Sequence, residues 1–257
     1  MVLKTKKGWY IVAWNIIVRL CLLHVFYLVG EMRINKLLSN YGICSRTGVN
    51  KLIEENRITV NGKLSVPGQW VDTEDIILID NEKILVKDKV YIALNKPSGI
   101  TCTAAKNVES NIIKFMNYPE YIFPVGRLDK ESQGLILLTN DGELANEIIK
   151  SENEHEKEYI VTVNKPFDDF FMDGMSEGVQ IFGVNTRPCE VSRVNVDTFR
   201  IILTQGLNKQ IRRMSKAFGF TVVRLQRIRI INIKIDGIEN GTWRYLTDKE
   251  VIELRNK

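Results

Sequence analysis

The chain has 257 residues, of which 44% are hydrophobic and 26% charged, values that are ordinary for a globular protein with one or two cores. Its four cysteines lie far apart, with no CxxC pair and only two histidines, so the composition argues against a zinc site and against a disulfide framework. The net charge of +5 is mildly basic, and its distribution along the chain is more informative than its size.

Residues 1–31 are predicted to be an extension outside the fold. The stretch from Trp9 to Gly30 is mostly apolar, but Asn15, Arg19 and His24 interrupt it. A central arginine costs roughly 2.5–3.5 kcal/mol on membrane-insertion scales. We therefore expect a cytoplasmic protein without a membrane partner, and a membrane anchor is the alternative interpretation.

Residues 32–80 are expected to form a small first domain. Apolar residues recur at helical spacing from Ile34 and again after Ser45, which is the expected N-cap of a second helix. The pair Asn61-Gly62 between two short apolar runs is typical of a two-residue type I′ hairpin turn. Two helices and a β-hairpin are therefore predicted for this domain.

A second and larger domain, residues 90–257, is expected after a polar linker at residues 81–89. Short β-branched runs alternate here with helical patterns, which predicts a mixed α+β fold. Strands are expected at 90–94, 121–125, 135–139, 159–163, 198–203 and 222–230, and helices at 143–149, before Gly219 and after the capping box Thr247-x-x-Glu250.

A basic segment without any acidic residue lies between Gln205 and Ile235. Its cations are Lys209, Arg212, Arg213, Lys216, Arg224, Arg227, Arg229 and Lys234. Cations at this density repel one another unless a polyanion or a buried carboxylate neutralises them. The segment therefore indicates contact with a polyanion or buried ion pairs, and a solvated basic face is the alternative for any single residue.

The segment that starts at Arg33 and ends with the hairpin at Leu64 resembles the S4 RNA-binding domain. This resemblance implies that basic side chains from the helices and the hairpin contact the phosphates of structured RNA. The candidate RNA-binding residues are Arg33, Lys36, Arg46, Lys51 and Arg57. For each of them taken singly, a solvated surface charge is the alternative.

Four motifs of the second domain occur in the order typical of one enzyme family. They are Lys96-Pro97-x-Gly99, Gly126-Arg127-Leu128-Asp129 followed by Ser132-Gln133-Gly134-Leu135, Lys157-x-Tyr159, and Gly206-Leu207-Asn208-Lys209-Gln210-Ile211-Arg212-Arg213-Met214. Together with the S4-like segment they resemble the RsuA family of RNA pseudouridine synthases, and the surrounding sequence looks like that of RluF-type members.

The resemblance implies site-specific isomerisation of uridine to pseudouridine in structured RNA, with no cofactor and no metal. RluF-type enzymes modify large-subunit (23S) rRNA and, in some bacteria, a tRNA anticodon, so these RNAs are the expected partners of a monomeric enzyme. The rival interpretation is a non-catalytic S4-type protein that only binds ribosomal RNA. A paired-histidine nuclease is disfavoured, because one of the two histidines lies in the extension.

Three residues are expected to carry the chemistry. Breaking the C1′–N1 bond of uridine requires a carboxylate, as a covalent nucleophile or as a proton acceptor, and Asp129 is the acid of its motif. An adjacent guanidinium keeps such a carboxylate ionised, and the resemblance gives this role to Arg212. Tyr159 is expected to stack on the flipped uracil. The alternatives are a turn aspartate, a surface cation and a core tyrosine.

Four further basic residues are expected to contact RNA around this site. Arg127 is expected to fill the gap that the flipped base leaves, with a structural salt bridge as the alternative. Lys96 is expected to support the pocket or to contact a phosphate, with a simple turn lysine as the alternative. Arg213 is expected to meet a phosphate. Lys209 is also expected to contact RNA, although a lysine carries the charge of an arginine without the bidentate geometry of the guanidinium.

Overall fold

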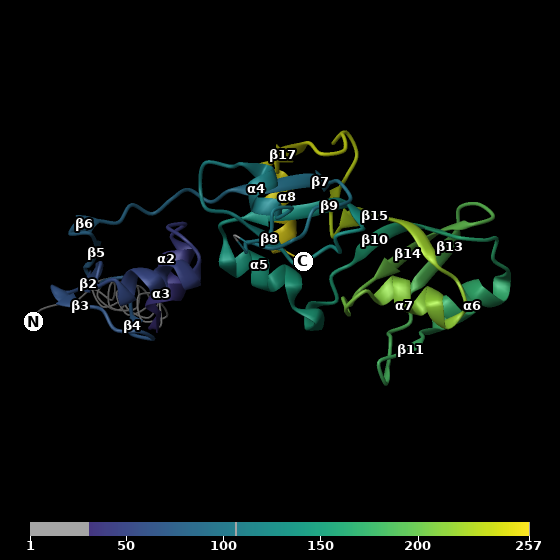
Figure 1. Ribbon diagram of the computed structural model, residues 1–257, viewed down its shortest axis with the longest axis horizontal. Helices are drawn as coiled ribbons and strands as arrows, with labels where there is room; N and C mark the ends of the chain where they lie inside the picture. Colours follow the sequence, from purple (N-terminus) through teal and green to yellow (C-terminus); the bar gives the residue numbers. More distant parts are fainter. Residues whose placement is uncertain (1–30, 106, 257) are drawn as a thin grey trace, which may run out of the picture. The chain divides into compact units, whose positions relative to one another are not determined.

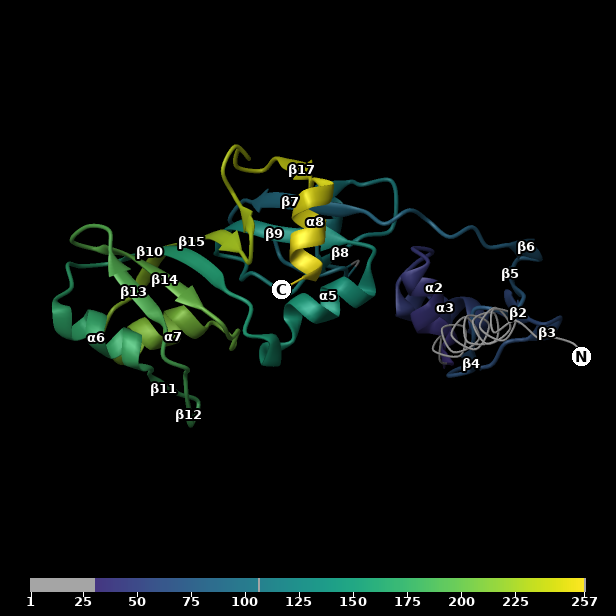
Figure 2. The same ribbon diagram turned by 180° about the vertical axis from the view of Figure 1, so that it is seen from behind.

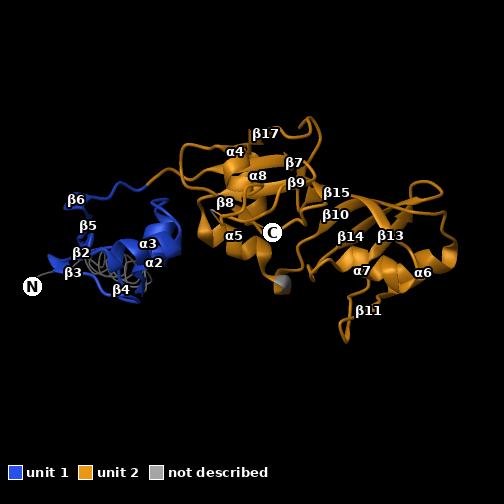
Figure 3. Cartoon of the chain, in the orientation of Figure 1, with its two compact units in different colours: residues 1–86 blue, residues 87–257 orange. Residues whose placement is uncertain are grey.

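The computed structural model describes residues 31–105 and 107–256, so the prediction for the N-terminal extension lies outside the described residues, apart from Glu31. The chain forms two compact units, divided between Val86 and Lys87, within the segment predicted as a linker (Figure 3). Among the described helices, none combines the length and the apolar character that a membrane span requires.

Over residues 31–86, which the structure describes, the first unit contains two helices and two small antiparallel sheets (Figure 1). Its elements are β1 (Met32–Arg33), α2 (Ile34–Asn40), α3 (Arg46–Glu54), β2 (Ile58–Val60), β3 (Lys63–Leu64), β4 (Trp70–Val71), β5 (Ile77–Ile79) and β6 (Glu82–Lys83). Strands β3, β2, β5 and β6 form one sheet in that order, and β1 pairs with β4. The helices and this sheet share one core, which includes the fully buried Ile34, Leu38, Val49 and Ile58.

The local signals of the sequence are confirmed in this unit. Ser45 Oγ accepts a hydrogen bond from the N–H of Gly48 at 3.0 Å and so caps α3. Asn61 and Gly62 have φ angles of 51° and 78°, the left-handed values that a type I′ turn needs. The strands β1, β4 and β6 were not predicted, because a strand of two residues is too short to show a periodic pattern.

A nine-stranded sheet forms the centre of the second unit (Figures 1 and 2). Its strands are β7 (Tyr91–Lys96), β8 (Phe123–Val125), β9 (Gln133–Thr139), β10 (Lys157–Val163), β13 (Glu190–Arg193), β14 (Thr198–Leu203), β15 (Val222–Ile230), β16 (Ile233–Lys234) and β17 (Trp243–Tyr245). Their order is β13-β14-β10-β15-β9-β7-β17, with β16 paired to β15 and β8 to β9. The sheet is mixed, because β9 and β15 run parallel while the other described strands pair antiparallel.

Helices cover both faces of this sheet. They are α4 (Ile112–Met116), α5 (Gly142–Ile149), α6 (Asp169–Glu177), α7 (Gln210–Ala217) and α8 (Asp248–Arg255), and the hairpin β11 (Gln180–Ile181) and β12 (Val184–Asn185) follows α6. Alternate residues of β7 enter two separate cores, as the two-residue period of a strand requires. Ile92 and Leu94 belong to the same buried cluster as residues of α4, α6 and α7, whereas Ala93 belongs to the cluster that contains residues of α5 and α8.

The mixed α+β fold is confirmed, and strands 198–203 and 222–230 have the predicted bounds. The capping box is also present, because Thr247 and Glu250 each accept a backbone N–H of the other residue. Several elements were not predicted: α4, α6, β11, β12, β13, β16 and β17. Most of them are short, and β11, β12 and β16 are strands of only two residues, too short to show a periodic pattern.

The parallel seam between β9 and β15 joins the two halves of the sheet. Gln133 pairs with Gln226 and Gly134 with Arg227. Gly134 has a φ angle of 106°, and a Cβ atom at this position would lie 2.3 Å from the carbonyl oxygen of Arg227. The two backbones therefore approach so closely that only glycine fits the seam.

Candidate active site

A cleft of about 700 Å³ opens in the second unit. Its lining comes from six segments: the loop after β7, the end of β8 with the β8–β9 connection, the end of α5, β10, the end of β14 with the β14–α7 connection and the first turn of α7, and β15. Asp129, Tyr159 and Arg212, which belong to three separate sequence motifs, all line this cleft. The fold thus brings together the three residues predicted to carry the chemistry.

Asp129 is held by a tight turn between β8 and β9. Gly126 has a φ angle of 72° near the start of this connection, and the carbonyl of Asp129 accepts the N–H of Ser132 at 3.0 Å. Ser132 is fully buried and anchors the turn, whereas the side chain of Asp129 stays 29% exposed. The carboxylate therefore remains accessible from the cleft.

Arg212 is fixed by two hydrogen bonds and forms an ion pair with Asp129. Its Nη1 donates to the carbonyl of Val222 at 3.0 Å and its Nη2 to Oγ of Ser132 at 3.1 Å. Its Nε lies 3.9 Å from Oδ2 of Asp129, too long for a hydrogen bond. This Nε is buried and has no hydrogen-bond partner among the described residues, so one donor of the guanidinium is left beside the carboxylate.

Tyr159 lies on β10, opposite Ile201 of β14 and Arg227 of β15. The pairing with β15 shifts between Glu158 and Tyr159, which indicates a β-bulge or a similar irregularity. Such irregularities re-aim side chains and are frequent next to active sites. Tyr159 is 9% exposed and borders the cleft, so the core fixes most of its ring.

Two cations of the cleft were not predicted as site residues. Arg227 is 3% exposed, its Nε donates to the carbonyl of Leu135 at 2.6 Å, and its Nη2 is buried without a partner in the described chain. Lys157 donates to the carbonyl of His155 at 3.0 Å. Burial, and then the charge of Arg227, lower the pKa of Lys157 to about 8. The two-residue period of strand β15 could have indicated that Arg227 is buried, because Arg227 lies on the same face of the strand as the buried Leu225.

Comparisons with known proteins identify the family. Residues 90–217 match the RNA pseudouridylate synthase family, and residues 32–77 match the S4 domain. The chain is 47% identical over 228 residues to the dual-specificity RNA pseudouridine synthase RluF of Escherichia coli (strain K12), an alignment that covers 88% of this chain and 79% of that relative. The chain belongs to the RsuA family of RNA pseudouridine synthases and is of the RluF type.

More distant relatives agree with this assignment. The synthase is 31% identical over 232 residues to the ribosomal large subunit pseudouridine synthase B of Bacillus subtilis (strain 168), covering 87% of this chain and 95% of that relative. A crystal structure of a pseudouridylate synthase superposes with a TM-score of 0.65 at 28% identity, covering 87% of this chain and 99% of that structure. The family decides against the rival interpretation of a non-catalytic RNA-binding protein.

Of three other predicted cations, two line the cleft and one does not. Arg127 and Lys209 are exposed and line the cleft. Arg213 does not belong to the lining. Its guanidinium lies 3.6 Å from the centre of the Phe182 ring, and its Nε donates to the carbonyl of Asn208 at 2.9 Å.

Lys96 has a different environment from the one expected of an RNA-binding residue. It is fully buried, and its Nζ donates to the carbonyls of Pro97 at 3.0 Å and Ile100 at 2.8 Å. Burial is also the main reason why its pKa is lowered. The prediction of a phosphate contact is corrected accordingly: Lys96 supports the loop after β7, and its ammonium is not accessible to RNA.

Buried and surface carboxylates neutralise other predicted cations. Glu158 is 8% exposed and accepts from Nε of Arg229 at 2.6 Å, so one member of the basic segment has a protein partner. In the first unit, Arg57 forms an ion pair with Asp80 at 2.6 Å, and Lys51 lies 3.7 Å from Glu55. The remaining candidates of that unit, Arg33, Lys36 and Arg46, line a separate pocket.

Lys157→Met should change how stability depends on pH. An unfolded lysine titrates near 10.4, and the folded pKa is about 8, so the unfolded chain binds more protons between these values. Wild type therefore gains stability as the pH rises through this window. The variant should lack this gain and unfold at a higher temperature than wild type at pH 7. Thermal unfolding from pH 7 to 11 measures both, with Lys249→Met, 86% exposed, as the control. A constant difference in Tm would contradict the prediction.

Proposed function

We propose that this synthase converts specific uridines of 23S rRNA to pseudouridine, with a tRNA anticodon uridine as a second target and Asp129 as the nucleophile. The RNA targets are supported by the 47% identity to a dual-specificity synthase and by the likeness to a large-subunit enzyme. The nucleophile is supported by one observation above all: in the cleft the Asp129 carboxylate lies 3.9 Å from the Arg212 guanidinium. The two opposite charges attract, so the guanidinium helps to hold the carboxylate in the cleft.

The cleft has the size for one extruded nucleotide. Its volume of about 700 Å³ lies within the usual range of ligand pockets. A uridine inside folded RNA hides both C1′ and C5, so it must leave its stack before the carboxylate can reach it. Arg127 and Lys209, both exposed on the lining, would contact the RNA that flanks the flipped uridine.

The proposed chemistry needs no redox step. A carboxylate oxygen of Asp129 attacks C1′, the C1′–N1 bond breaks, and uracil leaves as an anion. The uracil turns within the cleft, C5 bonds to C1′, and the carboxylate is released. The C5 proton then passes to a base, for which the Tyr159 hydroxyl is the candidate, while N1 gains a proton. The unused donor of Arg227 and the ammonium of Lys157 would stabilise the uracil anion.

The experiment that tests the targets compares RNA from three strains. Pseudouridines are mapped by carbodiimide primer extension in 23S rRNA and tRNA from a strain that lacks the gene. The same RNAs are mapped after complementation with wild type and with Asp129→Asn. We expect stops that are lost on deletion and restored by wild type alone. If no 23S rRNA position depends on the gene, the proposed target is wrong.

Tyr159 variants test the stacking role. Tyr159→Phe keeps the ring and should keep the RNA affinity, whereas Tyr159→Ala should lose roughly 1–3 kcal/mol of base stacking. Affinities for a hairpin that contains the target uridine measure the difference, and far-UV circular dichroism verifies that both variants fold. If Phe binds as weakly as Ala, stacking is the wrong account of this residue. Slower turnover of Tyr159→Phe at full binding would support the hydroxyl as proton acceptor.

A further inference from the structure

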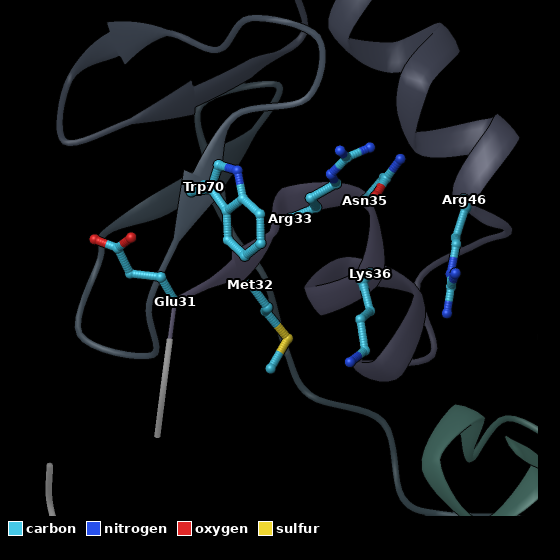
Figure 4. A pocket seen from close by; sticks show the side chains of 7 residues that line it. All are labelled: Glu31, Met32, Arg33, Asn35, Lys36, Arg46 and Trp70. Atoms are coloured by element: carbon cyan, nitrogen blue, oxygen red, sulfur yellow. The ribbon is translucent and has the colours of Figure 1, made fainter. Parts of the chain in front are cut away.

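The first unit has a pocket of its own, with a volume of about 320 Å³ (Figure 4). Its lining comes from β1, α2, the start of α3 and β4. The lining residues are Glu31, Met32, Arg33, Asn35, Lys36, Arg46 and Trp70. We call this site the Trp70 pocket.

Trp70 is an exposed aromatic residue on a fixed backbone. It is 57% exposed, yet its strand pairs with β1, where Trp70 lies opposite Arg33. The N–H of Ile34 also donates to the carbonyl of Gln69 at 2.9 Å. The indole makes no aromatic contact within the described chain, unlike Trp243, which packs against two tyrosines. A large ring held in place without a stacking neighbour is the arrangement that accepts a nucleic-acid base.

The charges of the Trp70 pocket are suited to phosphate. Arg33, Lys36 and Arg46 come from three different elements and line the pocket, where Glu31 is the one acidic residue among the described lining residues. None of the three cations forms an ion pair within residues 31–105 or 107–256, in contrast to Lys51 and Arg57 of the same unit. Unpaired cations around an aromatic ring are typical of surfaces that bind single-stranded RNA.

We propose that the Trp70 pocket binds one unpaired nucleotide of the substrate RNA. Trp70 stacks on the base, and Arg33, Lys36 and Arg46 contact the flanking phosphates. A continuous duplex would use the cations but leave the indole unused, because its bases are already stacked. The substrate must therefore carry a bulged or looped nucleotide besides the uridine that enters the cleft. This inference rests on the proposed function only in taking the substrate RNA as the ligand.

The decisive measurement is the coupling between residue 70 and the unpaired base. The probe is a fluorescein-labelled RNA hairpin with a one-nucleotide bulge, compared with the same hairpin carrying an abasic bulge, and the protein is the full chain. Trp70→Ala should weaken binding of the bulged hairpin by about 5- to 150-fold and leave binding of the abasic hairpin unchanged. Trp70→Phe should bind the bulged hairpin nearly as wild type does.

Two further variants provide the controls. Leu64→Ala removes an equally exposed apolar side chain, 57% exposed, from the same unit outside the pocket, and it should bind both hairpins as wild type does. Lys36→Ala should flatten the slope of log affinity against log salt by roughly 0.7–0.9 units. Equal losses for Trp70→Ala on both hairpins, or no loss on either, would overturn the proposal and leave a protein partner for this pocket.

Turnover separates this inference from the proposed function. Trp70 belongs to the first unit, so Trp70→Ala should raise KM for 23S rRNA and leave kcat unchanged. If wild type forms no pseudouridine in 23S rRNA but Trp70→Ala still weakens binding of the bulged hairpin alone, the proposed RNA target is wrong and the proposal for the Trp70 pocket is supported. If wild type forms pseudouridine in 23S rRNA but Trp70→Ala affects the bulged and the abasic hairpin equally, only the proposal for the Trp70 pocket is wrong.

Discussion

Asp129→Asn is expected to abolish pseudouridine formation and to leave RNA affinity nearly unchanged. The amide keeps the shape of the side chain and the backbone turn through Ser132, but it is no nucleophile and no longer pairs with Arg212. Loss of a catalytic nucleophile lowers kcat by factors on the order of 10⁴ to 10⁶. Single-turnover kinetics at saturating RNA are the measurement, with the affinity determined separately.

A neighbouring carboxylate provides the matched control for Asp129→Asn. Glu131→Gln makes the same change of charge two residues further along, at an exposed side chain that does not line the cleft. It should retain wild-type kcat. Residual activity of Asp129→Asn close to that of Glu131→Gln would show that another group attacks C1′ and that the proposed mechanism is wrong.

Gly134→Ala is expected to destabilise the second unit by about 3–5 kcal/mol, the sum of backbone strain and overpacking. The new Cβ would lie 2.3 Å from the carbonyl oxygen and 2.7 Å from the nitrogen of Arg227, and both are backbone atoms that cannot rotate away. The seam between β9 and β15 would have to open. Urea unfolding followed by circular dichroism measures the loss.

The control for Gly134→Ala is Gly183→Ala. Gly183 also has a positive φ angle, 74°, but its Cβ would meet no atom within 4 Å. Only the left-handed strain of roughly 1–2 kcal/mol then remains. Equal losses of stability in the two variants would contradict the steric explanation, because both variants share the backbone strain and only one has the clash.

The sequence predicted those parts of the molecule that depend on neighbouring residues. The cap at Ser45, the turn at Asn61-Gly62 and the capping box at Thr247 each depend on three or four consecutive positions. Asp129, Tyr159 and Arg212 could be named because their motifs resemble those of a known family. That they line one cleft follows from strand pairing between distant segments, which no local pattern encodes.

The residues that sequence reasoning missed owe their roles to tertiary contacts. Arg227 is one of eight basic residues in the segment from Gln205 to Ile235, and the alternation of β15 alone did not single it out from them. The pairing of β15 with β9 and β10 accounts for the burial of its side chain. Lys157 was named as part of the motif Lys157-x-Tyr159 but not as a site residue, and its pKa is lowered by burial in the folded sheet and by the charge of Arg227. Lys96 was misjudged for the same reason, because a lysine in a turn motif is ordinarily solvated.

The seam between β9 and β15 also has a consequence for biosynthesis. Pairing of Gln133 with Gln226 closes a loop of about 90 residues, and such non-local pairing forms late, because the entropy of closing the loop is lost before the contacts are gained. On the ribosome, Asp129 emerges long before Arg212 and β15 do. A nascent chain thus exposes its S4 domain, whose contacts are local, while its catalytic cleft is still incomplete. We therefore expect RNA binding to become available during translation, and isomerisation only after the chain is nearly finished.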